Sequence, residues 1–187
     1  MVVHRKESGI LNRDSDYKEL LVGCGHRIHK DFGPKDRQHW TNLTTLDINP
    51  DCNPDVVWDL NDFPYPFNDD EFDEIHAYDV LEHCGIQGDY KFFFEQFTEF
   101  WRIIKHGCLF CVSVPKWDGM WGFGDPGHTR VLPPGCFTYL SQAKYKQLGE
   151  TKMTDYRNIY HANFEIIKQE LIDNLALHIY LVAIKEK

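Results

Sequence analysis

The sequence predicts an α/β domain with a mostly parallel sheet that ends in an antiparallel hairpin. Apolar stretches of strand length alternate with helical or irregular connections through most of the chain, a pattern typical of doubly wound sheets. The last two apolar stretches, residues 164–172 and 175–186, flank Asp173-Asn174, a turn signal that favours a hairpin. Glycines or acidic residues end the first four strands, at the edge where parallel sheets bind ligands.

Five strands are expected before the hairpin. Each is a short apolar or β-branched run bounded by glycine, proline, asparagine or aspartate, the residues that interrupt strands. The predicted strands cover residues 17–23, 43–48, 55–60, 72–79 and 108–115.

One helix is expected over residues 90–105, because its large apolar residues repeat at the spacing of one helical face. These residues are Phe93, Phe97, Phe100 and Ile104, and His106-Gly107 follow them as a helix end. A second helix is expected over residues 134–148. Residues 26–42 have no helical period and are interrupted by Gly33-Pro34, so they predict an irregular connection.

Length and composition predict a single domain over residues 1–187. The chain is 42% hydrophobic and 26% charged, as is usual for a globular protein. No apolar run reaches the roughly 20 residues of a membrane span, and residues 1–20 lack the apolar core of a signal peptide, so we expect a cytoplasmic protein. The net charge of −9 argues against autonomous binding of nucleic acid, which uses a basic face.

The six cysteines are scattered along the chain and predict reduced thiols. Cys108 and Cys111 have the spacing of metal ligands, but they lie in a predicted strand. Residues three apart on a strand point to opposite faces, so this pair cannot converge on one ion. We expect no metal site.

The strand ends carry residues that suit a nucleoside. Gly23 and Gly25 end the first strand, where glycine permits a positive φ and a close approach of a ligand. Asp47 ends the second strand, 22 residues after Gly25, and an acid there can accept hydrogen bonds from both ribose hydroxyls. Asp59 suits the edge of an adenine, and Asp79 ends the fourth strand. Any one acid could be only a strand cap, but four successive polar strand ends are hard to obtain by chance.

The stretch LTTLDINPDCNPDVVWDLNDFPYPFNDDEFDEIHAYDVLEH, residues 43–83, resembles the core of a class I S-adenosylmethionine-dependent methyltransferase of the small type 11-like branch. The resemblance is dense over residues 20–83 and continues at lower specificity through Lys185. It implies a Rossmann-like fold with seven strands in the order 3-2-1-4-5-7-6, an antiparallel strand 7, and helices on both faces of the sheet.

The resemblance also implies S-adenosylmethionine as the cofactor and S-adenosylhomocysteine as the product. Two positions depart from the family pattern, since Leu21 replaces an acid and Arg27 replaces a third glycine. The implied cofactor contacts are Gly23, Cys24 and Gly25 at the methionine and ribose, Asp47 at the ribose hydroxyls, Ile48 at the adenine face, Asp59 and Leu60 at the adenine edge, and Tyr78 and Asp79 near the sulfonium.

Methyl transfer is an in-line displacement in which the protein aligns the reactants and sometimes supplies a base. His128 lies in a loop where similar family members carry Asp-Pro-x-His-x-Arg, and we expect it to act as that base, with Arg130 orienting the acceptor. His83 is either a second catalytic residue of the pocket or a cap of the loop before the helix. Trp117 and Trp121 either stack on the acceptor or bury the loop.

The sequence therefore predicts a methyltransferase that acts on an oxygen or nitrogen atom of a small molecule. Two alternatives stay open: methylation of a nucleic-acid base or modified nucleotide, and a non-catalytic protein that binds the cofactor or a partner. A dinucleotide-dependent dehydrogenase is disfavoured, because Ile28 stands where the last glycine of its fingerprint belongs. The short chain leaves few residues for a substrate domain, so loops or a homo-oligomeric partner are expected to complete the acceptor site.

Overall fold

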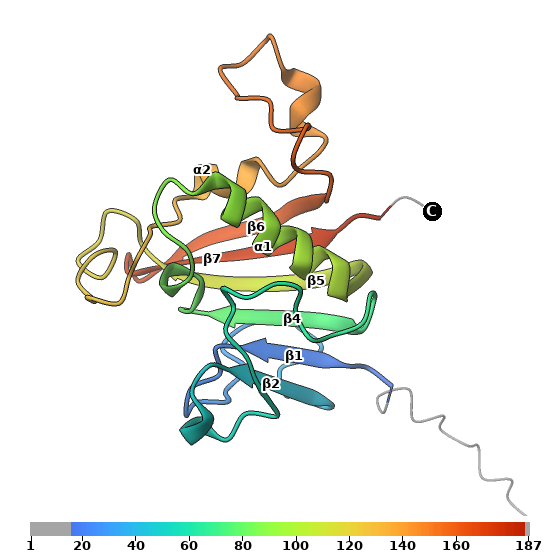
Figure 1. Cartoon of the computed structure of the whole chain (residues 1–187), viewed down its shortest axis with the longest axis vertical. Coiled ribbons are helices and arrows are strands. Elements are labelled where there is room, and N and C mark those ends of the chain that lie inside the picture. The colour runs from blue at the N-terminus through green and yellow to red at the C-terminus, as the bar shows by residue number, and fades with distance from the viewer. Residues whose placement is uncertain (1–15, 186–187) are drawn as a thin grey trace, which may run out of the picture.

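The computed structural model describes residues 16–185 and contains one seven-stranded sheet (Figure 1). Its strands are β1 (Glu19–Val22), β2 (Leu43–Asp47), β3 (Val56–Val57), β4 (Phe72–Tyr78), β5 (Ile104–Pro115), β6 (Phe164–Ile172) and β7 (Ala176–Ala183). They lie in the order β3-β2-β1-β4-β5-β7-β6. The first five pair in parallel, and β7 runs antiparallel to both β5 and β6. The predicted mostly parallel sheet with an antiparallel C-terminal hairpin is confirmed.

One predicted strand has a different length in the structure, and the residues at the two chain ends are not described. The third strand is shorter than predicted, because Asp59 already begins a turn in which the Asp62 N–H donates to the Asp59 carbonyl (3.0 Å). Residues 1–15, for which no signal peptide was expected, and residues 186–187 lie outside the described part of the chain.

The helix predicted over residues 90–105 is present as α1 (Tyr90–Ile103). Its start is fixed by Asp89, whose side chain accepts a hydrogen bond from the Phe92 N–H (3.0 Å), as an N-cap residue does. It ends two residues early because β5 begins at Ile104. No helix within residues 16–185 combines the length and the apolarity that crossing a bilayer requires.

The helix predicted over residues 134–148 is wrong over most of its length. Only α2 (Pro134–Thr138) and a 3₁₀ turn, η3 (Lys144–Gln147), form there. The break has a cause in the sheet: the Leu140 carbonyl accepts from the Phe164 N–H at the start of β6 (2.9 Å), so it does not continue a helix.

Both α-helices pack on the same face of the sheet (Figure 1). The Phe97 ring of α1 contacts the Phe137 ring of α2, with centroids 5.9 Å apart. It also contacts Phe110 of β5 and Phe164 of β6. These four rings are fully buried, and they form the centre of the aromatic core that supports the strand ends.

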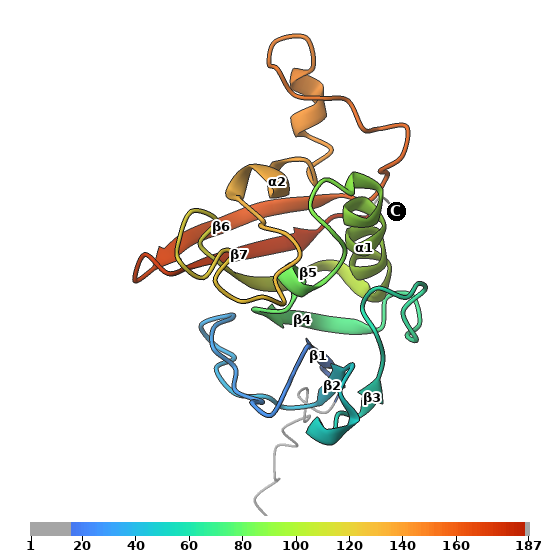
Figure 2. The same ribbon diagram turned by 60° about the vertical axis from the view of Figure 1, so that its left-hand side comes forward.

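The opposite face of the sheet is covered by the irregular segment of residues 25–42, which Figure 2 shows on the other side of the sheet from α1. The Phe32 ring stacks on the His178 ring of β7, with centroids 4.0 Å apart, and Trp40 meets His76 of β4 edge-on. The irregular connection is confirmed. The expectation of helices on both faces is wrong for residues 16–185, because this segment fills the second face without a helix.

Candidate active site

A cavity of about 360 Å³ lies at the carboxyl ends of β1, β2 and β4, and we call it the strand-end cavity. Its volume is in the range of small-molecule sites. It is lined by Gly23, Leu46, Asp47, Ile48, Trp58, Asp59, Leu60, Asn61, Asp79, Val80, His83 and Cys84. The structure therefore brings seven of the predicted site residues together, and it adds Leu46, Trp58, Asn61, Val80 and Cys84.

The turn after β1 must be made by glycine. Gly23 has φ of +63°, and a Cβ at this position would lie 2.2 Å from Cγ2 of Val80, well inside contact distance. Gly25 follows with φ of +50°, and its N–H donates to Oδ2 of Asp47 (2.7 Å). The glycine turn thus connects the end of β1 to the acidic end of β2.

Asp47 is held in place by the backbone. Its second oxygen, Oδ1, accepts from the Asn49 N–H (2.9 Å), and the residue is 9% exposed. Since a carboxylate oxygen can accept more than one hydrogen bond, both oxygens keep the capacity to accept from a ligand hydroxyl. Ile48, the next residue, is 61% exposed and offers an apolar surface at the cavity wall.

The third strand end contributes an Asx turn. Oδ1 of Asp59 accepts from both the backbone N–H and the side-chain amide of Asn61 (2.8 Å each). Oδ1 of Asn61 in turn accepts from the Gly85 N–H (2.7 Å). Asn61 therefore ties the end of β3 to the segment after β4, a role that the Asp-x-Asn spacing of a local turn could have indicated.

Tyr78 and Asp79, both predicted near the sulfonium, lie in different surroundings at the end of β4. Asp79 lines the cavity, with φ of +50°, and its Oδ1 accepts from the Ser113 hydroxyl (2.9 Å). The Tyr78 hydroxyl instead donates to the Phe32 carbonyl (2.6 Å), beneath the segment of residues 25–42. Strand alternation explains this, because Tyr78 shares its face with His76. Cys24, which is buried, and Gly25 also lie outside the set of lining residues.

Two histidines meet beside the strand-end cavity. The His83 and His128 rings pack edge to face, with centroids 4.6 Å apart. Nδ1 of His83 lies 3.1 Å from the Gly127 carbonyl, and Nδ1 of His128 lies 2.8 Å from the Trp121 carbonyl. Because a carbonyl only accepts, each Nδ1 carries the proton and donates, which leaves Nε2 of each neutral ring as an acceptor.

Glu82 is buried beneath these rings. Its Oε1 lies 3.9 Å from Nε2 of His128, and the residue is 2% exposed. Neither carboxyl oxygen has a hydrogen-bond partner among the described residues. Burial, together with the nearby Asp79 carboxylate, raises the pKa of Glu82 to about 8.

Solved structures share this architecture. A chain from the complex between the Haloferax volcanii Trm112 methyltransferase activator and a protein assigned as a methyltransferase aligns with a TM-score of 0.56 and 13% identity, over 91% of this chain and 84% of that chain. A SAM-dependent methyltransferase from Archaeoglobus fulgidus aligns with a TM-score of 0.55 and 15% identity, over 90% of this chain and 87% of that chain. The N-methyltransferase NodS from Bradyrhizobium japonicum WM9 aligns with a TM-score of 0.52 and 13% identity, over 90% of this chain and 86% of that chain. This chain has the class I methyltransferase fold.

No family model matches the sequence, and no curated protein matches it at a significant level. The strand order predicted from the resemblance, 3-2-1-4-5-7-6, is the order in the structure.

The three residues predicted to contact the acceptor differ in their surroundings. Arg130 is buried, and its guanidinium donates to the Leu81 carbonyl and to Oε1 of Gln96. Trp117 packs partly buried against the core. Trp121 is 51% exposed. Arg130 thus has a structural role in this methyltransferase fold, whereas Trp121 is available at the surface.

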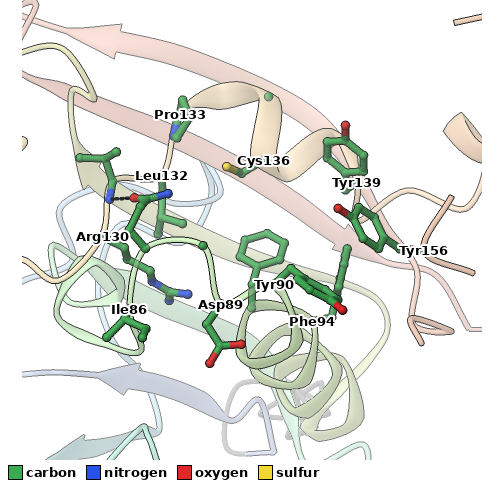
Figure 3. A pocket seen from close by; sticks show the side chains of 15 residues that line it. Ile86, Asp89, Tyr90, Phe94, Arg130, Leu132, Pro133, Cys136, Tyr139 and Tyr156 are labelled. Atoms are coloured by element: carbon green, nitrogen blue, oxygen red, sulfur yellow. Dashed lines mark hydrogen bonds between the residues drawn. The ribbon is translucent and has the colours of Figure 1, made fainter. Parts of the chain in front are cut away.

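A second cavity, of about 410 Å³, lies between the start of α1 and the chain around α2, and we call it the aromatic cavity (Figure 3). Figure 3 shows Tyr139 and Tyr156 gathered toward one end, near Phe94 and Tyr90, and Arg130 toward the other. The two cavities are lined by successive parts of one segment, because residues 83–84 line the strand-end cavity and residues 86–89 line the aromatic cavity.

Proposed function

We propose that this chain is an S-adenosylmethionine-dependent methyltransferase that methylates an oxygen or nitrogen atom of a small molecule and releases S-adenosylhomocysteine. The observation that carries the proposal is the hydrogen bond from Gly25 to Asp47 (2.7 Å), through which the glycine turn fixes an acid at the end of β2. The exposed Ile48 beside it supports the same assignment, as does the fold shared with methyltransferases.

The lining residues fit the parts of this cofactor. Asp47 would accept from the ribose hydroxyls, and Ile48 would pack on the adenine ring. Asp59 and the Leu60 backbone would bond the adenine edge. When bound, the cofactor supplies a methyl group activated on a sulfonium, and the task of the protein is to align and desolvate it.

Asp79 is our candidate for the acid that the cofactor ammonium requires. Leu21 occupies the position where many family members carry that acid, and it is buried within the sheet. Asp79 lines the cavity from β4, so it can offer a carboxylate to the same ligand from another strand.

The acceptor would enter beside His83 and His128. Nε2 of His128 would accept the proton that an oxygen or nitrogen acceptor loses on methylation, because Nδ1 already donates to the backbone. The aromatic cavity supports a small organic acceptor with a planar apolar part, which its tyrosine rings would contact. The net charge of −9 favours such an acceptor over nucleic acid.

Calorimetric titration with S-adenosylmethionine and S-adenosylhomocysteine tests the proposal. We expect the wild type to bind with micromolar affinity, about −8 kcal/mol, and Asp47→Ala to weaken binding at least about tenfold through loss of the ribose contacts. Asp51→Ala, which removes an exposed acid four residues further on, is the matched control and should bind as the wild type does. Absence of binding to the wild type, or equal binding to Asp47→Ala, would contradict the proposal.

A further inference from the structure

The methyltransferase fold alone does not explain why the Glu82 carboxyl is buried. Its side chain is 2% exposed, and both carboxyl oxygens lack a hydrogen-bond partner among the described residues. Burial of an unpaired carboxyl is costly, and such groups are rare in native proteins unless a water or an ion satisfies them.

The surroundings of Glu82 have the geometry of an ion site. Glu82, His83 and His128 each offer one ligand atom, and the three atoms lie within 4.8 Å of one another. Oε1 of Glu82 lies 3.9 Å from Nε2 of His128. Tetrahedral zinc with bonds of about 2.1 Å holds its ligands about 3.4 Å apart, so a shift of about 0.5 Å closes this pair on an ion.

The hydrogen bonds of the two histidine rings suit metal binding. Both Nδ1 atoms are engaged by backbone carbonyls, those of Gly127 and Trp121. A metal-bound histidine almost always donates its other ring N–H to a carbonyl or carboxylate, which fixes the tautomer and the ring orientation. The same arrangement here leaves Nε2 of each ring available to an ion.

The electrostatic surroundings favour a cation. The carboxylates of Asp79 and Asp125 both act on Glu82 through space, so negative charge gathers at this point. Arg130 opposes them, but its guanidinium donates its hydrogen bonds to Leu81 and Gln96 rather than to Glu82. No side-chain cation within residues 16–185 is hydrogen-bonded to the Glu82 carboxyl.

We propose that Glu82, His83 and His128 bind one divalent transition-metal ion, with Zn²⁺ as the best chemical match, at the edge of the strand-end cavity. Two imidazoles and a carboxylate suit zinc and its neighbours, whereas Mg²⁺ and Ca²⁺ prefer oxygen ligands alone. Three protein ligands leave a position open, as in catalytic zinc sites. The proposal departs from the expectation that the chain has no metal site, which considered only the cysteines.

A part of the inference rests on the proposed function, namely what the ion does for methyl transfer. A cation at this position would lower the pKa of an oxygen acceptor bound to it. In the metal-bound form His83 and His128 would act as ligands, so His128 would not be the base named above, and the acceptor would release its proton to solvent water.

Metal binding is tested on the full chain after chelator treatment and dialysis. The probes are Zn²⁺ by calorimetry and elemental analysis, Co²⁺ by its visible absorption, and Mg²⁺ as the hard cation. The variants are Glu82→Gln, which keeps the side-chain shape without the charge, and His128→Gln. His161→Gln is the matched control, because His161 is exposed outside the cluster. Circular dichroism checks that every variant is folded.

We expect one equivalent of Zn²⁺ on the wild type and on His161→Gln, Co²⁺ absorption that Zn²⁺ displaces, and affinity at least about tenfold weaker in Glu82→Gln and His128→Gln. A wild type that binds no Zn²⁺, or a Glu82→Gln variant that binds it equally well, would overturn the metal site. Titration of S-adenosylhomocysteine in the presence of chelator keeps the two proposals separate. If S-adenosylhomocysteine binds but Zn²⁺ does not, only the proposed function is supported. If Zn²⁺ binds but S-adenosylhomocysteine does not, only the metal site is supported.

Discussion

Two clusters of ionisable side chains centre on buried carboxyl groups, Glu74 within β4 and Glu82 just after it. Among the described residues, only the Glu74 carboxyl is bonded to a cation. In the first, Nζ of Lys30 lies 2.6 Å from Oε1 of Glu19 and 2.7 Å from Oε1 of Glu74, with all three side chains at most 2% exposed. In the second, Glu82 is equally buried but has no bonded partner among the described residues. The first cluster, whose charges compensate one another within the chain, stabilises the fold. The second cluster, whose carboxyl lacks a partner, suits a ligand.

The first cluster is satisfied at nearly every atom. His76 contacts Oε1 of Glu74 through Nε2 (2.5 Å), and the Tyr17 hydroxyl donates to Oε2 (2.8 Å). The Thr41 N–H donates to Oε2 of Glu19 (2.7 Å). Lys30 and Thr41 belong to the irregular segment, so this cluster attaches that segment to the sheet in place of a helix.

Removal of the cation should have the largest effect. Lys30→Met leaves Glu19 and Glu74 buried beside each other without compensation, and we expect the free energy of unfolding to fall by about 3–5 kcal/mol. Urea denaturation measures this change, and Lys35→Met, at an exposed position of the same segment, should change it by less than about 0.5 kcal/mol. A loss below about 1 kcal/mol for Lys30→Met would show that the cluster does not hold the segment.

The second largest effect should be the destabilisation of the first cluster by acid. Burial alone would raise the pKa of Glu19 and Glu74, but the bonds from Lys30, Thr41 and His76 hold both below their usual range. Their contribution is therefore present above pH of about 4.5 and is lost as the pH falls through the lowered pKa values.

His76 acts in the same direction under acid. Burial lowers its pKa, so the unfolded chain takes up the proton first and stability declines as the pH falls below about 6.5. We expect the free energy of unfolding to decrease between pH 7 and pH 4, by up to about 1.4 kcal/mol per pH unit for each proton. In His76→Gln the part of the slope between pH 6.5 and pH 5 should be smaller, and an unchanged slope would contradict this origin.

Substitution in the second cluster, at Glu82, should change the free energy of unfolding least. Glu82→Gln removes a carboxyl that has no partner to lose, so in the presence of chelator we expect the free energy of unfolding at pH 7 to change by less than about 1 kcal/mol. Glu74→Gln is the matched comparison and should cost clearly more, because it breaks the contacts with Lys30 and His76. Equal losses in the two variants would remove the distinction between the clusters.

Local signals explain what the sequence could predict. The strands and the terminal hairpin were marked by apolar runs and turn residues, and Gly23, Asp47 and Asp59 stand directly at strand ends, so the strand-end cavity could be assembled from the order of the strands. The irregular segment was also visible, since Gly33-Pro34 interrupts it.

Contacts between distant parts of the chain account for the rest. The ion pair of Lys30 with Glu74 and the proximity of His128 to Glu82 depend on three-dimensional packing that no local spacing encodes. Leu140 bonds to β6 instead of continuing a helix for the same reason. The position of Tyr78 was predictable in principle, because strand alternation puts it on the face of His76 and not in the cavity.

A crystal structure with bound S-adenosylhomocysteine tests the central claim most directly, since it locates the ligand relative to every lining residue. We predict the ribose hydroxyls on the carboxylate of Asp47, the adenine ring against Ile48, and the sulfur on the side of the cavity formed by Asp79 and His83. A ligand bound elsewhere, or one in the cavity without contact to Asp47, would contradict the account.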